Sequence, residues 1–164
     1  MAVANCHYQG WNGSKKDLKK AFDEFVKIEK DMNGYHYAQY MIGVCYDFGN
    51  GTEQDSTTAF EWYTKSAAQG NSDAMNNLGY SYQHGFGVDQ DLTKAFELYE
   101  QSALLGNSYG MFNVGVFYEK GVGVTRNLNK AKKWYAKSAA QGNDGAQTKL
   151  DKLNAPPAAE SDDE

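Results

Sequence analysis

The hydrophobic positions of this chain recur with a period of 36 residues. An aliphatic residue followed by glycine appears three times, and a tyrosine lies four positions after each aliphatic residue. These positions are Ile42-Gly43, Leu78-Gly79 and Val114-Gly115, with Tyr46, Tyr82 and Tyr118. A fixed period of about 20–50 residues is typical of stacked supersecondary units, each of which buries its apolar face against its neighbours. The pattern therefore predicts a repeat protein.

The first half of each unit has the spacing of an amphipathic helix. A small residue, an aliphatic residue and a tyrosine recur at i, i+4 and i+8, which places them on one helical face. This spacing predicts helices at 37–48, 73–84 and 109–120. The glycine inside each helix costs about 1 kcal/mol relative to alanine. We therefore expect a second helix to approach closely at that glycine.

The second half of each unit predicts another helix, at 56–69, 92–105 and 128–141, after a G-x-G turn. An Asp or Asn precedes each of these helices and can cap its first turn. A glycine follows each of them and can adopt the left-handed conformation that ends a helix. On the inner face of these helices we expect Trp62 and Trp134 to be the largest packing residues.

The period divides the chain into segments. Three repeats are expected at 36–71, 72–107 and 108–143, and residues 1–35 are interpreted as a degraded N-terminal copy. Segment 144–154 is more polar and rich in lysine, as is expected of a capping helix. Segment 155–164 is acidic and predicted to be disordered.

Residues 110–143 resemble the Sel-1-like repeat, a relative of the tetratricopeptide repeat. The positions that carry the resemblance are Val114-Gly115, Tyr118, Gly121-x-Gly123-Val124, Lys130-Ala131, Trp134-Tyr135, Lys137-Ser138-Ala139 and Gly142. Three positions depart from the family pattern: Gly110 for Ala, Asn127 for Asp and Ser138 for Ala. The resemblance extends over roughly residues 4–153.

This resemblance implies an all-α fold, an α/α superhelical solenoid of about four antiparallel helix pairs, with the first helix of each pair on the concave side. Family members mostly act as adaptors and scaffolds in signalling, in protein quality control and in bacterial interactions with host cells. The fold carries no shared catalytic residue, so a specific function does not follow from it. The resemblance favours a non-catalytic scaffold for protein–protein interaction.

Composition and charge narrow the class of partner. The net charge of −5 argues against nucleic acid, because phosphate binding requires a basic face. No run of about 18 apolar residues is present, so no membrane insertion is expected. The first ten residues lack the apolar region of a secretory signal. We therefore expect a cytoplasmic protein that is monomeric or weakly self-associating and binds a protein or peptide.

The exposed face of the first helices is the candidate binding surface. It combines aromatic side chains, which anchor interfaces, with asparagine amides, which can pair with a peptide backbone. The candidate partner-binding residues are Tyr37, Tyr40, Met41, Asp73, Asn76, Asn77, Tyr80, His84, Tyr109, Phe112 and Asn113. The same face also includes Asp47 and Phe48. These residues predict a groove that binds a peptide or a helix. The alternative is that several of the aromatic residues pack between adjacent helices.

Residues with catalytic or metal-binding chemistry do not form a recognisable pattern. The histidines His7, His36 and His84 occupy unrelated positions of the period, and no His or Cys pair has zinc spacing. Cys6 and Cys45 recur in no other repeat, which favours reduced, structural thiols. No catalytic residue, metal or cofactor is predicted.

Two other functional classes remain open. The chain is alternatively a structural segment, or a self-associating unit, of a longer repeat array. A cysteine-rich branch of the family has been linked to penicillin binding and places paired cysteines in every repeat. Since this chain lacks such pairs, a hydrolase is a remote alternative. Ser161 precedes Asp-Asp-Glu and is a candidate phosphorylation site in the acidic tail.

Overall fold

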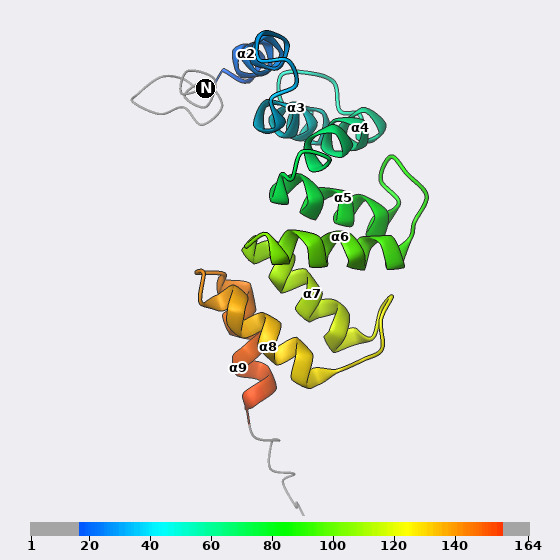
Figure 1. Ribbon diagram of the computed structural model, residues 1–164, viewed down its shortest axis with the longest axis vertical. Coiled ribbons are helices and arrows are strands. Elements are labelled where there is room, and N and C mark those ends of the chain that lie inside the picture. The colour runs from blue at the N-terminus through cyan, green and yellow to red at the C-terminus, as the bar shows by residue number, and fades with distance from the viewer. Residues whose placement is uncertain (1–16, 156–164) are drawn as a thin grey trace, which may run out of the picture.

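The computed structural model describes residues 17–155, and this part of the chain contains eight helices and no strand. The helices are α2 (Leu18–Asp31), α3 (His36–Phe48), α4 (Ser56–Ala67), α5 (Ser72–His84), α6 (Leu92–Leu104), α7 (Ser108–Lys120), α8 (Leu128–Ala139) and α9 (Asp144–Asn154). Each helix packs against the next along the chain, and the pairs form a twisted stack (Figure 1). The predicted all-α solenoid is confirmed. The first helix of the degraded copy, Cys6, His7 and Ser161 lie outside the described residues.

Helices of two kinds alternate in the stack. We call α3, α5, α7 and α9 the A helices, and α2, α4, α6 and α8 the B helices. Equivalent A helices begin 36 residues apart, at His36, Ser72, Ser108 and Asp144. The B helices end one or two residues earlier than the sequence predicts, because a short turn precedes the glycine that separates each of them from the next A helix.

The predicted capping residues define the helix ends. The side chains of Asp55, Asp91 and Asn127 accept hydrogen bonds from backbone N–H groups in the first turns of α4, α6 and α8. Helices α3, α5 and α7 each end at a glycine in the left-handed conformation, with φ of 66° at Gly49, 74° at Gly85 and 72° at Gly121. Glycine adopts this conformation without steric cost. The predicted N-caps are thus confirmed. The glycines expected to end the B helices, Gly70, Gly106 and Gly142, are left-handed, with φ of 85°, 92° and 83°, but each follows a C-cap residue, which is Ala68, Leu105 or Ala140.

The largest fully buried side chains of the three repeats are tyrosines, so the expectation for the tryptophans was wrong. Tyr63, Tyr99 and Tyr135 expose 1%, 0% and 0% of their surface, whereas Trp62 and Trp134 are half-buried. Each tyrosine ring covers the glycine inside the A helix of its own repeat. A Cβ on Gly79 would lie 2.8 Å from ring atoms of Tyr99, closer than real contacts allow. The expected close approach is confirmed, although it is a ring that approaches.

A buried serine links the two helices of each repeat. Ser66, Ser102 and Ser138 are fully buried, and each donates its hydroxyl to a carbonyl oxygen at the start of the preceding A helix. The acceptors are His36, Ser72 and Ser108, at 2.6, 2.7 and 2.7 Å. Because a buried hydroxyl without a partner would be costly, these bonds fix the end of each B helix against its A helix.

Candidate functional site

The buried tyrosines bring polar side chains to the surface of the A helices. The hydroxyl of Tyr63 donates to Asp47 Oδ2 at 3.2 Å, and that of Tyr99 donates to Gln83 Oε1 at 2.9 Å. The hydroxyl of Tyr135 donates to Glu119 in the same way. The acceptor lies 16 residues before each tyrosine. Each repeat therefore places one hydrogen-bonded acid or amide near the C-terminal end of its A helix.

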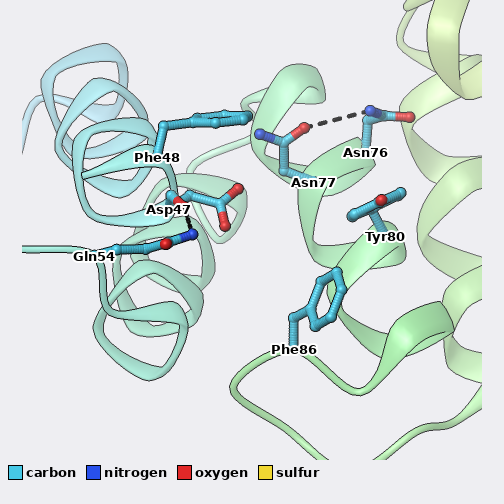
Figure 2. Close-up of a pocket in the computed structure, with 7 residues that line it drawn as sticks. All are labelled: Asp47, Phe48, Gln54, Asn76, Asn77, Tyr80 and Phe86. Atoms are coloured by element: carbon cyan, nitrogen blue, oxygen red, sulfur yellow. Dashed lines mark hydrogen bonds between the residues drawn. The ribbon is translucent and has the colours of Figure 1, made fainter. Parts of the chain in front are cut away.

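A groove opens between α3 and α5 on this surface (Figure 2). Its volume is about 370 Å³. It is lined by Asp47, Phe48, Gln54, Asn76, Asn77, Tyr80 and Phe86. We call this the α3–α5 groove. Its walls come from two successive A helices, and the loops that follow them add Gln54 and Phe86.

Amide side chains form the polar part of the α3–α5 groove. Asn113 on α7 donates to Asn76 Oδ1 at 2.9 Å, and Asn76 contacts Asn77 Oδ1 at 3.4 Å. Asn77 also interacts with the hydroxyl of Tyr63, whose pKa it acts to lower, and that hydroxyl donates to Asp47. A continuous polar network thus runs across three A helices. Because it joins successive repeats, it orients the amides that face the groove.

Aromatic side chains form the apolar part of the groove. Phe48, Tyr80 and Phe86 expose 68%, 48% and 46% of their surface. The ring of Tyr80 lies 5.9 Å from that of Phe86 and 4.3 Å from that of His84, and His84 stacks on Phe86 at 5.6 Å. Large aromatics with this exposure are typical of interface anchors. The ring of Phe48 points toward Asn77 (Figure 2).

The sequence-predicted residues divide into three groups. Asn76, Asn77 and Tyr80 line the groove, and His84 and Asn113 contact residues that line it. Four other residues, Tyr37, Tyr40, Met41 and Phe112, pack against the core, with Met41 only 6% exposed. Asp73 and Tyr109 are exposed outside the groove, and Asp73 accepts a hydrogen bond from Asn107 at 2.6 Å. The alternative of packing between helices therefore holds for part of the predicted set.

Two residues of the groove were missed by the sequence analysis because they lie in turns. Phe86 stands between the two glycines of its G-x-G turn, where the other repeats have Asn50 and Val122. An aromatic residue at this position was the available signal. Gln54 donates to the carbonyl oxygen of Asp47 at 2.8 Å, and Gln90 and Arg126 make the equivalent bond in the later repeats. Glutamine recurs at this position in two of the three repeats and Arg126 replaces it in the third, so the recurrence of Gln54 and Gln90 was the available signal.

Two carboxyl groups on this surface have shifted pKa values, in opposite directions. Burial raises the pKa of Asp47, against the smaller opposing effect of the hydrogen bond from Tyr63. Burial also acts to raise the pKa of Glu119, but hydrogen bonds from Tyr135 and Lys149 outweigh it and hold that pKa below its usual value. Lys149 Nζ lies 3.0 Å from Glu119 Oε2. The groove at Asp47 therefore disfavours negative charge more than the surface at Glu119 does.

The described residues include no cluster of metal-ligating side chains, and their single cysteine is buried. Within residues 17–155, no group of three His, Cys, Asp or Glu side chains could hold a metal ion. Burial raises the pKa of the Cys45 thiol to about 11, which keeps it protonated and unreactive at neutral pH. None of the eight described helices has the length and apolar character to cross a membrane.

Comparison with known proteins identifies the repeat. The family model of the Sel1 repeat matches residues 1–23, 36–71, 72–107 and 108–143. A Sel1 repeat protein from Oxalobacter formigenes has a crystal structure similar to this one, with a TM-score of 0.82 and 33% identity over 92% of this chain and 60% of that chain. No curated protein matches the chain significantly.

Two further solved structures are similar. One is a protective antigen with an SLR fold present in uropathogenic Escherichia coli, with a TM-score of 0.82 and 35% identity over 93% of this chain and 32% of that one. The other is cysteine-rich protein B of Helicobacter pylori, with a TM-score of 0.65 and 27% identity over 83% of this chain and 96% of that one. The chain thus spans about 60% and 32% of the first two neighbours. Its repeated tyrosine-on-glycine contacts, its capped helix pairs and the four matched segments together place the chain in the Sel1 repeat family.

Proposed function

We propose that this chain is a non-catalytic interaction module that binds a peptide or a helix of a partner protein in the α3–α5 groove. One observation carries the proposal: three large aromatic side chains stay exposed around a hollow that also presents oriented amides. Aromatic residues give rigid contact area, and amides can pair with a peptide backbone. Sel1 repeat proteins commonly serve as interaction scaffolds, which supports the proposal.

The groove favours a partner segment without acidic residues at its centre. Asp47 lies at the edge of the groove, and its raised pKa shows that the site already disfavours negative charge. A peptide that donates hydrogen bonds to Asp47 and to the asparagine amides would satisfy these acceptors. Its apolar side chains would then pack against Phe48, Tyr80 and Phe86.

The experiment compares three immobilised chains exposed to native cell lysate, with retained proteins identified by mass spectrometry. The first is unaltered, the second carries Phe48→Ala, Tyr80→Ala and Phe86→Ala, and the third carries Leu104→Ala and Leu105→Ala. Leu104 and Leu105 are at least as exposed as most of the groove aromatics, at 73% and 56%, but lie outside the groove. We expect a partner that the first and third chains retain and the second loses. Equal retention by all three would place binding elsewhere.

A second function, as a structural or self-associating part of a longer array, is favoured by two observations. The chain matches only part of two longer neighbours, over 60% and 32% of their length. Val26 and Met32 of α2 are also exposed, at 41% and 59%. Sedimentation velocity over a range of concentrations tests this role: dimers that Val26→Ser and Met32→Ser abolish would support it.

A further inference from the structure

The first and third repeats have a tryptophan, Trp62 or Trp134, at a position where the middle repeat has none. Trp62 and Trp134 each lie under a lysine three residues later, with Lys65 Nζ 4.1 Å and Lys137 Nζ 4.3 Å from the ring centroids. The middle repeat has Leu98 and Gln101 at these positions. It therefore lacks both the indole ring and the cation that covers it.

One aromatic contact beside this position recurs in all three repeats. Each has a phenylalanine of one B helix in edge-to-face contact with a tyrosine of the following A helix. These pairs are Phe22–Tyr46, Phe60–Tyr82 and Phe96–Tyr118, with centroid distances of 5.5, 5.4 and 5.4 Å. Trp62 packs against the cluster that contains the first pair, and Trp134 against the cluster that contains the third. Leu98 lies against the cluster that includes Phe60.

A hollow is present where the middle repeat lacks its tryptophan. It has a volume of about 310 Å³ and is lined by residues of α4, α5 and α6, none of which lines the α3–α5 groove. Phe60, Leu78, Tyr82 and Leu98 supply its apolar lining, and Gln101 lies at its edge. This volume is within the range of pockets that hold small ligands. We call it the α4–α6 hollow.

The charged residues of the α4–α6 hollow are complementary to an indole. Lys94 lines the hollow with its Nζ 5.2 Å from the Tyr82 ring centroid, and an ammonium group attracts the face of an electron-rich ring. Glu97 also lines the hollow, and its carboxylate can accept the single N–H that an indole donates. An aliphatic side chain would use neither group.

We propose that the α4–α6 hollow is a binding site for a tryptophan side chain of a partner protein. The chain itself shows the fit, because its own Trp62 and Trp134 occupy the equivalent positions beside an equivalent Phe–Tyr pair. The partner supplies in trans the ring that the other two repeats supply in cis. This site is separate from the α3–α5 groove and does not depend on it.

The experiment titrates N-acetyl-L-tryptophanamide into the full chain with labelled methyl groups and follows the spectrum by NMR. We expect saturable shifts of the Leu78 and Leu98 methyls, with a Kd on the order of 1 mM for so small a probe. N-acetyl-L-leucinamide is the control and should bind at least several-fold more weakly. Absence of saturable shifts, or equal binding of both probes, would overturn the proposal.

Two reciprocal variants test the proposal further, so that the test stands even if one of them does not fold. Leu98→Trp with Gln101→Lys restores the pair found in the other repeats, and we expect loss of probe binding and a rise in Tm of about 2–4 °C. A fall in Tm would show that the hollow does not fit an indole. The reciprocal variant, Trp134→Leu with Lys137→Gln, should create a second site that shifts the Val114 methyls. A folded variant without that site would also contradict the proposal.

Sedimentation velocity distinguishes a second copy of this chain from another protein. The third tryptophan, Trp11, lies outside the described residues. Dimerisation that is lost in the Leu98→Trp variant and in a Trp11→Ala variant would assign the hollow to a second copy. That result would overturn the assignment to a different partner protein. A monomer that still binds the probe supports it.

Discussion

Repeats 36–71 and 108–143 contain the same buried tyrosine, bonded to a carboxylate of the same A-helix position, but the two carboxylates differ. The pKa of Asp47 is raised and that of Glu119 is lowered. The tyrosine ring, the glycine beneath it and the hydrogen bond are shared. Part of the difference lies in the same A helix, because Lys120 beside Glu119 acts to lower its pKa, whereas the neutral Phe48 holds the equivalent position beside Asp47.

The next A helix supplies a larger part of the difference. Lys149 bonds to both oxygens of Glu119, at 3.1 and 3.0 Å. Two periods earlier, the position of Lys149 is held by Asn77, which is neutral and interacts with Tyr63. A cation stabilises a half-buried carboxylate against the cost of desolvation, whereas an amide compensates much less. One position in each A helix thus sets the charge preference of the surface contributed by the repeat before it.

Removal of the tyrosine ring breaks the shared part of the comparison and has the largest expected effect. Tyr63→Ala and Tyr135→Ala should each lower the free energy of unfolding by about 3–5 kcal/mol, because each leaves a large cavity beside a glycine. Trp134→Ala, at a half-buried position, should cost only about 1–2 kcal/mol. Urea denaturation monitored by circular dichroism measures all three. A greater loss for the tryptophan variant would contradict the order of burial described above.

Replacement of each carboxylate by its amide should change the free energy of unfolding by different amounts in the two repeats. Glu119→Gln keeps an acceptor for Tyr135 but removes the ion pair with Lys149, and should cost about 1 kcal/mol at pH 7 because the pair is partly exposed. Asp47→Asn removes a charge that burial already disfavours, so the free energy of unfolding should change by no more than about 0.5 kcal/mol. Urea denaturation at pH 7 is the measurement. Equal losses would show that Lys149 contributes nothing specific.

Acidification should affect the two sites in opposite directions. Glu119 has a folded pKa below its unfolded value, so its contribution to stability is present at neutral pH and is lost as the pH falls through the folded pKa. Asp47 has a raised folded pKa, so its contribution is present at low pH and is lost as the pH rises through that pKa. Between pH 6 and pH 3, the unaltered chain should lose stability relative to Glu119→Gln and gain it relative to Asp47→Asn. If the free energy of unfolding of all three chains changed in parallel with pH, the two carboxylates would not differ in this way.

Exchange of the neighbouring residues should convert one site into the other, with the smallest effect on stability. Asn77→Lys should lower the pKa of Asp47, and Lys149→Asn should raise that of Glu119. Carboxyl 13C chemical shifts followed against pH report both values directly. The free energy of unfolding should change by only a few tenths to about 1 kcal/mol, as is usual for partly exposed ion pairs. An unchanged Asp47 pKa in the first variant would show that backbone placement, and not residue type, determines the difference.

The sequence predicted the helices and their ends well because those depend on local chemistry. Helical spacing, an Asp before α4 and α6, and glycines after the A helices act within a few residues. The choice between Trp62 and Tyr63 depends on another helix. Both are large, and adjacent residues lie only about 100° apart around a helix. Only the contact of Tyr63 with Gly43 and its bond to Asp47 decide which ring is buried.

The groove was predicted less completely than the fold. Asn76, Asn77 and Tyr80 were identified because they lie on the exposed side of a predicted helix. Phe86 was not, since the position of a turn residue depends on the path of the loop. Met41 was placed on the surface although α2 covers it, because the degraded first copy gave little indication of where α2 packs.

The serine bonds within each repeat have a consequence for how the chain folds. Ser66, Ser102 and Ser138 each bond to a carbonyl at the start of the same helical hairpin, 30 residues earlier, and the tyrosine bonds span 16 residues. Contacts confined to such separations give a low contact order and rapid closure, however many repeats follow. An array built this way can lengthen by duplication without slowing the search for its native contacts.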